Sequence, residues 1–371
     1  MLQLKIKPVL YKFETCREFA DEFQVGEGDL ILTNQYIYEP CFGKMNLNAD
    51  VIYQEKYGSG EPSDEMIEAI YQDVKKLHTK RIIAIGGGTV LDIAKIFALK
   101  NVSPLLDLID GRLDVVKEKE FLAVPTTCGT GSEVTCLAAV ELKSRGTKIG
   151  FGVEEMFADA AVLIPELLKG LPLKFFAASS IDAFIHAIES YLSPKATSYT
   201  ELYSMEAMRL ILNGYQQIFT EGPEARLALL GDFLTASNYA GIAFGNAGCA
   251  AVHAMSYPLG GNYHVPHGES NYAMFSGVFR TYMKKDPQGK IADLNRMLSG
   301  WLSCNPDQVY DRIEELFDYV LPRKALHEYG MTENDCALFA DIVVEKQVRL
   351  TNNNYTELTR EDYLNIYREL Y

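Results

Sequence analysis

The segment RIIAIGGGTVLDIAKIFAL (Arg81–Leu99) has the pattern of a strand, a tight turn and a helix in succession. An apolar run of strand length ends in three glycines, and apolar residues then recur at helical spacing. The segment EFLAVPTTCGTGSEVT (Glu120–Thr135) repeats the order, with an apolar strand, a polar loop and a predicted helix. Strands that alternate with helices indicate βαβ units and a largely parallel sheet.

Outward from these segments the same alternation continues towards the N-terminus. DLILTN (Asp29–Asn34) and ADVIYQ (Ala49–Gln54) are predicted strands, and a helix is expected to open at Pro62 and Ser63. The first residues, MLQLKIKPVLYKF, alternate apolar and basic side chains, which predicts a further strand. Beyond about residue 170 long helical patterns replace the strands, and we place the boundary within LIPELLKGLPLKF (Leu163–Phe175). We therefore expect an α/β domain over residues 1–170 and an all-helical domain over residues 171–371.

The composition limits the classes of partner. The chain has 371 residues and a formal net charge of −15, which disfavours nucleic acid and anionic membranes as partners. No stretch has the ~18 consecutive apolar residues that a membrane-spanning helix needs. The seven cysteines are scattered and include no CxxC pair, which predicts reduced thiols and a cytoplasmic protein.

Two loops have the composition of phosphate-binding sites. Gly86, Gly87 and Gly88 follow a strand and precede a helix, where free N–H groups face an anion. PTTCGTGSE (Pro125–Glu133) follows the next predicted strand and adds hydroxyl groups. Both loops are also compatible with simple turns. Together they fit the crevice at the carboxyl ends of parallel strands, where open α/β sheets bind ligands.

A candidate metal site lies in the helical half. Asp182 and His186 are four residues apart on a predicted helix, so their Cβ atoms are about 5–6 Å apart. HAMSYPLGGNYHVPHG adds His253 and His267. Three imidazoles and one carboxylate suit Fe(II) or Zn(II) and leave coordination positions for substrate. The alternative is that these histidines are hydrogen-bonded core residues.

Four motifs occur together in one order: GGGTVLDIAK, PTTCGTGSEVT, SSIDAFIHAIESY and HAMSYPLGGNYHVPHG. In order and spacing the chain resembles the iron-containing (group III) alcohol dehydrogenases from about residue 5 to residue 350. Details such as EKYGSGEPSDEMI and GIAFGNAG are most similar to 4-hydroxybutyrate dehydrogenases. The resemblance implies a dehydroquinate synthase-like fold, with a Rossmann-like NAD(P) domain and a helical metal- and substrate-binding domain.

The resemblance also implies site residues. The expected metal ligands are Asp182, His186, His253 and His267. The expected cofactor-binding residues are Asn34, Gly86, Gly87, Gly88, Asp92, Thr126, Thr127, Ser132 and Lys148.

Three positions depart from the family pattern. Asn34 stands where many relatives carry an Asp that would repel a 2′-phosphate, so NADP is an alternative to the NAD that we expect. Tyr257 stands where many relatives have a second histidine near the nicotinamide. It is either a proton relay or a packing residue. His264 replaces a smaller polar residue, and either contacts the substrate or relays a proton, or hydrogen-bonds within a turn.

The expected reaction is hydride transfer between NAD(H) and a primary alcohol or aldehyde, with Fe(II), or alternatively Zn(II), as Lewis acid. The expected substrate pair is 4-hydroxybutyrate and succinate semialdehyde, and the expected assembly is a homodimer. The main alternative is a general primary-alcohol or diol dehydrogenase of the butanol, propanediol or lactaldehyde type. A zinc lyase or synthase on the related fold and an inactive metal-binding scaffold are further alternatives.

Overall fold

The computed structural model describes residues 2–371 of the chain. These residues form two compact units, one over Ile6–Leu171 and one over residues 2–5 together with Pro172–Tyr371. The predicted functional division into a cofactor-binding domain (1–170) and a metal- and substrate-binding domain (171–371) stays a prediction, because packing alone does not show what each unit binds.

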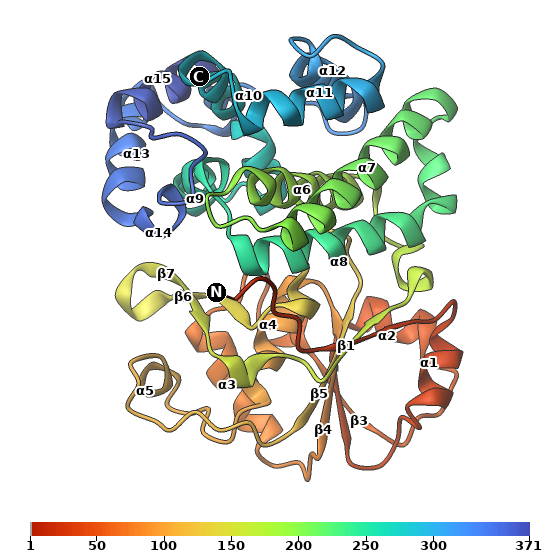
Figure 1. Cartoon of the computed structure of the whole chain (residues 1–371). Helices are drawn as coiled ribbons and strands as arrows, with labels where there is room; N and C mark the ends of the chain where they lie inside the picture. The colour runs from red at the N-terminus through yellow and green to blue at the C-terminus, as the bar shows by residue number, and fades with distance from the viewer. Residues whose placement is uncertain (1) are drawn as a thin grey trace. The chain divides into compact units, whose positions relative to one another are not determined.

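The first unit is an α/β unit built on a parallel sheet (Figure 1). Its six strands are ordered β1-β8-β5-β4-β2-β3, and all their pairings are parallel. The strands of the unit are β1 (Val9–Lys12), β2 (Asp29–Thr33), β3 (Asp50–Tyr53), β4 (Arg81–Gly86), β5 (Glu120–Pro125), β6 (Leu137–Leu142), β7 (Thr147–Gly152) and β8 (Ala160–Leu163). Its α-helices are α1 (Cys16–Glu22), α2 (Gln35–Cys41), α3 (Asp64–Val74), α4 (Gly88–Phe97) and α5 (Leu105–Ile109). The predicted parallel α/β fold is confirmed.

Buried strands hold this unit together. Ile82, Ile83 and Ala84 of β4 are all fully buried, although successive side chains of a strand point to opposite faces. Helices must therefore cover both faces of the sheet, as parallel sheets require. In Figure 1, α1 and α2 lie on the opposite side of the strands from α3 and α5. Helix α3 begins where the sequence predicts, with the Ser63 hydroxyl accepting from the Met66 N–H.

The second unit contains helices and no strands within Pro172–Tyr371. Its α-helices are α6 (Leu173–Leu192), α7 (Ser198–Glu221), α8 (Leu230–Ala247), α9 (Ala251–Tyr263), α10 (His267–Lys285), α11 (Lys290–Leu302), α12 (Val309–Asp318), α13 (Glu333–Lys346), α14 (Val348–Thr351) and α15 (Arg360–Leu370). Helix α6 is buried around almost its whole circumference and packs against α7, α8 and α10. A helix that is apolar on all sides occupies the interior, so α6 is the central helix of this unit.

Two predicted elements differ from the structure. The expected helix after the second loop is wrong: a single 3-10 turn, η2 (Ser132–Val134), leads into the antiparallel hairpin β6–β7. The side chains of β6 alternate between buried and less buried positions, which is the strand period. The N-terminal strand is shorter than predicted, because residues 2–5 belong to the helical unit, where the Lys5 N–H donates to Asn246 Oδ1 at 2.7 Å. Across residues 2–371, no helix combines the length and the apolar character needed to span a membrane.

Candidate metal centre and cofactor loops

The triple glycine joins β4 to α4 as the sequence predicts. Gly87 is the N-cap of α4 and offers no side chain to the N–H groups of the first turn. A helix N-terminus without a side-chain cap has free donors for an anion. A Cβ atom on Gly86 would lie 2.5 Å from the Val90 Cβ atom, so only glycine lets the chain turn this closely into α4.

The second loop lies beside the first. Strand β5 pairs with β4 in the register Gly86↔Pro125, and the Thr126 N–H donates to the Gly86 carbonyl at 3.0 Å. Thr127 approaches Gly87, because a Cβ on Gly87 would lie 3.5 Å from the Thr127 Cγ2 atom. The structure thus brings together five predicted phosphate-loop residues: Gly86, Gly87, Gly88, Thr126 and Thr127. Their role in cofactor binding stays a prediction.

Two further predicted cofactor residues lie in a buried polar network. The Ser132 hydroxyl donates to Asp92 Oδ1 at 2.6 Å, and Lys95 Nζ lies 2.6 Å from Ser132 Oγ and 3.0 Å from Asp92 Oδ1. Asp92 Oδ2 also accepts from the Ala139 N–H at 2.9 Å. These hydrogen bonds link α4 to Ser132, which precedes β6, and to Ala139 on β6. Lys95 is fully buried, and its ammonium group also donates to Thr135 Oγ1 and to the Leu137 carbonyl, so its charge is satisfied by contacts that the sequence pattern does not reveal.

The other two predicted cofactor residues make ionic or polar contacts elsewhere in the α/β unit. Asn34, directly after β2, donates to Gln54 Oε1 at 3.2 Å and to Glu55 Oε2 at 2.9 Å. Lys148 of β7 forms an ion pair with Glu61. Asn34 follows Thr33, whose register partner on β4 is Ile85, so Asn34 is beside the first glycine of the turn.

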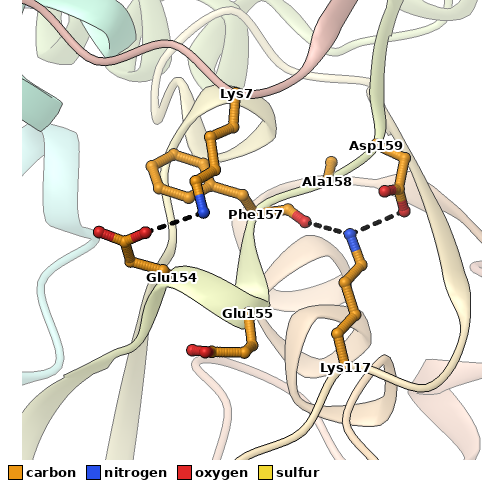
Figure 2. Close-up of a pocket in the computed structure, with 7 residues that line it drawn as sticks. All are labelled: Lys7, Lys117, Glu154, Glu155, Phe157, Ala158 and Asp159. Atoms are coloured by element: carbon orange, nitrogen blue, oxygen red, sulfur yellow. Dashed lines mark hydrogen bonds and ion pairs between the residues drawn. The ribbon is translucent and has the colours of Figure 1, made fainter.

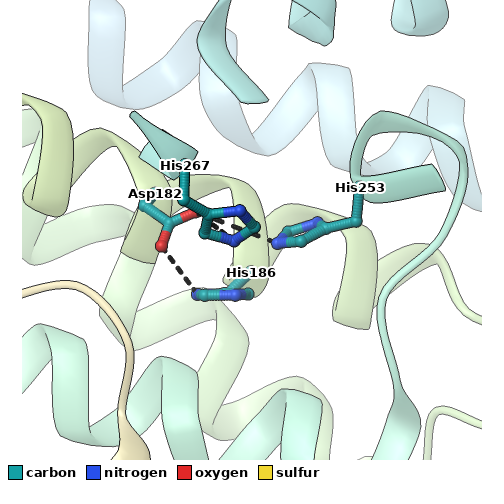
Figure 3. A group of neighbouring side chains, drawn as sticks. All are labelled: Asp182, His186, His253 and His267. Carbon is teal, nitrogen blue, oxygen red and sulfur yellow. Dashed lines mark ion pairs between the residues drawn. The ribbon is translucent and has the colours of Figure 1, made fainter. Parts of the chain in front are cut away.

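The four predicted metal ligands come from three helices of the second unit (Figure 3). Asp182 and His186 lie on α6, His253 lies on α9, and His267 is the first residue of α10. One ligand atom from each of the four side chains lies within 4.8 Å of the other three. His267 directly follows Pro266, the N-cap of α10, which agrees with its expected place after a turn.

Asp182 is the centre of the cluster. Its carboxylate oxygens lie 3.9 Å from His186 Nδ1, 3.8 Å from His253 Nε2 and 3.7 Å from His267 Nε2. The rings of His186 and His253 stack with centroids 4.6 Å apart. Burial raises the pKa of Asp182, but the three histidines and a hydrogen bond from Asn271 outweigh it and hold that pKa below its ordinary value. The carboxylate of Asp182 is therefore ionised at neutral pH.

The donor set fits a divalent transition metal. His253 Nε2 is buried and has no hydrogen-bond partner among the residues described, although it lies in a polar cluster. A buried ring nitrogen with a free lone pair is destabilising unless an ion binds it. Imidazole suits iron and zinc, and the carboxylate supplies a negative charge to the ion.

Two supporting residues are missing from the sequence prediction. Asn271 of α10 donates to Asp182 Oδ1 at 2.7 Å and lies 3.1 Å from His267 Nε2. Glu189 of α6 lies 2.7 Å from His253 Nδ1. Their spacing to the ligands, four residues after His267 and three after His186, was the available signal, since such residues share a helix face.

The two predicted auxiliary residues lie at different places on and after α9. Tyr257 is half-buried, and its ring centroid is 6.0 Å from that of His267. His264 is exposed and has a left-handed backbone conformation with φ 54° at the end of α9. The structure therefore brings Tyr257 close to His267 and places His264 in a turn three residues before His267.

A surface cavity in the α/β unit contains none of the predicted residues (Figure 2). It has a volume of about 440 Å³, and four of its five charged side chains are paired, Lys7 with Glu154 at 2.9 Å and Lys117 with Asp159 at 2.7 Å. Ligand sites are mostly apolar with a few convergent polar groups, which this cavity lacks. The cavity is therefore not a candidate for the functional site.

Comparison with solved structures places the fold. The chain is similar to sulfoacetaldehyde reductase from Bifidobacterium kashiwanohense in complex with NAD+, with a TM-score of 0.86, 22% identity and coverage of 100% of this chain and 99% of that chain. It is also similar to a 1,3-propanediol oxidoreductase, with a TM-score of 0.83, 21% identity and full coverage of both chains. The predicted fold class is confirmed.

Sequence comparison gives a nearer relative. The chain is 54% identical to 4-hydroxybutyrate dehydrogenase from Clostridium kluyveri over 371 residues, which is all of both proteins. It is 31% identical to sulfoacetaldehyde reductase from Bilophila wadsworthia over 82% of this chain and 80% of that protein. Residues 12–165 match the family described as iron-containing alcohol dehydrogenase, and residues 176–371 match the C-terminal part of the Fe-containing alcohol dehydrogenase family. The two matches together take in most of the chain, and the protein belongs to the iron-containing alcohol dehydrogenase family.

Proposed function

We propose that the protein is an NAD(H)-dependent oxidoreductase that interconverts 4-hydroxybutyrate and succinate semialdehyde. The observation that carries the substrate assignment is the 54% identity over the full length of both chains to a 4-hydroxybutyrate dehydrogenase. The chemistry is supported separately by the cluster of one carboxylate and three imidazoles.

In this proposal Asp182, His186, His253 and His267 hold Fe(II). The bound ion supplies Lewis-acid stabilisation of the negative charge that develops on the substrate oxygen. The protein's own contribution is to hold these ligands in place, since three of the four side chains are almost completely buried. Zn(II) binds such ligands more tightly than Fe(II) by the general affinity order, so zinc is expected to compete for the site.

The glycine turn and the neighbouring threonine loop are proposed to bind the dinucleotide. Backbone N–H groups at the start of α4 and hydroxyls of Thr126 and Thr127 would meet the pyrophosphate. NAD is favoured over NADP, because the carboxylate of Glu55 lies beside Asn34 at the ends of β2 and β3. A similar structure, sulfoacetaldehyde reductase, was solved with NAD+.

Tyr257 and His264 are proposed as auxiliary residues. Tyr257, whose ring centroid lies 6.0 Å from that of His267, is proposed to relay a proton through its hydroxyl. His264 is proposed to contact the carboxylate of the substrate, which an enzyme of net charge −15 must bind through local donors. We also propose a cytoplasmic location, from the scattered cysteines, and a homodimer, from family resemblance; light scattering coupled to gel filtration tests the latter.

Anaerobic NADH oxidation by the Fe(II)-loaded protein tests the proposed reaction. Succinate semialdehyde and butyraldehyde differ mainly in the carboxylate, so their kcat/KM ratio measures recognition of that group. A ratio well above ten supports the four-carbon acid. Equal values would instead indicate a general primary-alcohol or diol dehydrogenase, and no turnover of either aldehyde would contradict the oxidoreductase proposal.

His264→Asn tests the substrate contact. Asparagine tolerates the left-handed conformation of residue 264, so the turn is expected to persist. Loss of a charge-assisted hydrogen bond contributes on the order of 1.5 kcal/mol, which predicts about a tenfold rise in KM for succinate semialdehyde. The KM for butyraldehyde serves as the control and should not change. An unchanged KM for the semialdehyde would leave His264 as a turn residue.

A further inference from the structure

Glu189 shares a helix face with two of the proposed ligands. Asp182, His186 and Glu189 lie on α6 at positions i, i+4 and i+7, a spacing that places side chains in one stripe. All three are buried. A buried carboxylate is stable only when hydrogen-bond donors surround it, so the contacts of Glu189 define its role.

Both oxygens of the Glu189 carboxylate form hydrogen bonds with α9 or with Ala250, the residue before it. Oε2 accepts from the Ala250 N–H at 2.9 Å and lies 2.7 Å from His253 Nδ1. Oε1 accepts from the Val252 N–H at 2.6 Å. The N-cap of α9, Ala250, provides no side-chain hydrogen bond of its own. Glu189 therefore caps the N-terminus of α9 from a different helix, and the negative charge also suits the helix dipole there.

The same carboxylate determines which nitrogen of His253 is available. When Nδ1 donates its proton to Glu189, the lone pair remains on Nε2. That Nε2 atom is buried without a partner and lies 3.8 Å from Asp182 Oδ1, on the side of the ligand cluster shown in Figure 3. Histidine ligands of metals commonly donate their second N–H to a carboxylate, which orients the ring and raises its basicity.

We propose that Glu189 is a positioning residue of the metal centre, which holds His253 with Nε2 directed to the ion and fixes α9 against α6. This inference rests on the proposed metal site and goes beyond its four ligands. It assigns a function to the acidic residue of the HAIES segment (His186–Ser190).

A second reading of the same atoms is less consistent with the contacts. Cys249, Glu189 and His253 also offer ligand atoms within 4.8 Å of one another, which is the geometry of a separate metal site. His253 Nδ1 lies 2.7 Å from Glu189 Oε2, however, and a metal bound to Nδ1 would displace that hydrogen bond. Measured stoichiometry distinguishes the readings, because the second site would bring the total to two ions per chain.

Glu189→Gln is the direct test. The amide keeps the size of the side chain but presents N–H donors to groups that are themselves donors. Metal affinity is measured anaerobically for Fe(II), and separately for Zn(II), by competition with a chromophoric chelator. We expect affinity to fall by about 10–100-fold, the range typical of such supporting residues, with one ion bound per chain.

Glu314→Gln is the matched control. Glu314 is also a buried glutamate of the helical unit, but it lies on α12, and its carboxylate forms ion pairs with Arg280 and Arg323. We expect this variant to lower the thermal midpoint of the metal-free protein and to leave metal affinity unchanged. A Glu189→Gln affinity within threefold of the unmodified protein, or parallel losses in both variants, would overturn the positioning role.

A measurement on the unmodified protein covers the case in which Glu189→Gln does not fold. With only six histidines in the chain, ¹⁵N-histidine NMR of the Zn(II)-loaded protein can report the tautomer of each ring. The proposal requires His253 to carry its proton on Nδ1 and to coordinate through Nε2. Coordination through Nδ1, or two ions per chain, would contradict it. Since neither readout uses turnover, a failure of the proposed dehydrogenase activity remains separately visible.

Discussion

Asn34, directly after β2, is uncharged, but Glu55 provides a negative charge next to it. Its Oε1 accepts from the Gln35 N–H at 2.7 Å, and its Oε2 accepts from the Asn34 side chain at 2.9 Å. Asn34 thus acts as a hydrogen-bond donor that holds a carboxylate from the end of β3. Lys56, the next residue after Glu55, makes a cation–π contact with Tyr53, with its Nζ 5.0 Å from the centroid of that ring.

Glu55→Gln is expected to raise the use of NADPH. The substitution removes the charge that would repel a 2′-phosphate and leaves an acceptor for the Gln35 N–H. Measured interactions between exposed charges reach about 1 kcal/mol, so the ratio of the NADPH to the NADH dissociation constant should fall by up to about fivefold. Fluorescence titration with each nucleotide measures the ratio.

The control for Glu55 is Glu65→Gln, which removes an exposed carboxylate of α3 that pairs with Lys143. It should leave the ratio unchanged. If Glu55→Gln also leaves it unchanged, the carboxylate lies away from the ribose of the bound nucleotide.

Single residues differ in how far the sequence reveals them. Asp182 and His186 are visible because one helix fixes their spacing, whatever the rest of the chain does. His253 and His267 join them only through the motif resemblance, since separate helices carry them. Glu189 and Asn271 were missed because their spacing to His186 and His267 indicates only a shared helix face, whereas their contacts with His253 and Asp182 are tertiary.

At the scale of helices, the approach of α10 to α6 depends on Gly268. A Cβ atom there would lie 2.1 Å from the Ala178 carbonyl oxygen and 3.3 Å from the Asp182 Cβ atom. The first contact is with backbone and cannot be relieved by a side-chain rotation. Since His267 precedes Gly268, the close packing that glycine permits also sets the distance between His267 and Asp182.

Gly268→Ala is therefore expected to push α10 away and disrupt the metal centre. Overpacking of this kind typically destabilises by about 1–3 kcal/mol, and the displaced His267 should lower metal affinity at least tenfold. Chelator competition and thermal unfolding measure the two effects.

Gly277→Ala on the same helix provides the comparison. There a Cβ would meet the ends of the Ile366 and Leu370 side chains at 2.9 Å, and these can shift. We expect a smaller loss of stability and no change in metal affinity. Equal metal affinities for the two variants would show that the α6–α10 spacing does not control the site.

Helices and strands could be predicted where the local hydrophobic periodicity is strong. The strand–glycine–helix unit at Arg81–Leu99 and the long helices after residue 170 follow from periodicity alone. The order β1-β8-β5-β4-β2-β3 does not, because it depends on which strands pair across the chain. The helix predicted after the second loop was wrong, because the short, mostly apolar segment Leu137–Leu142 suits either a helix or a strand in composition. Its alternation of buried and less buried side chains is visible only in the folded chain.

At the scale of the whole chain, the proposed metal is a link between segments far apart in sequence. Its ligands span residues 182–267 and come from α6, α9 and α10, all in the helical unit. An ion that binds the folded protein and not the unfolded chain stabilises the fold by mass action. The three histidines and the aspartate are brought together only by folding, so the metal and the helical packing should stabilise each other.

Removal of the metal is therefore expected to lower the thermal stability of the protein. At a free metal concentration one hundred times the dissociation constant the gain is about 2.7 kcal/mol, which for a unit of this size corresponds to a rise of about 5–10 °C in Tm. Calorimetry of the chelated protein, followed by anaerobic titration with Fe(II) or Zn(II), should show a Tm that climbs with the logarithm of metal concentration. Asp182→Asn, which weakens the central ligand, should flatten that dependence whatever its own Tm. A Tm of the unmodified protein that does not respond to either metal would mean that the cluster of Asp182 and three histidines is stable without an ion, and the metal centre would then have to be abandoned together with the reaction built on it.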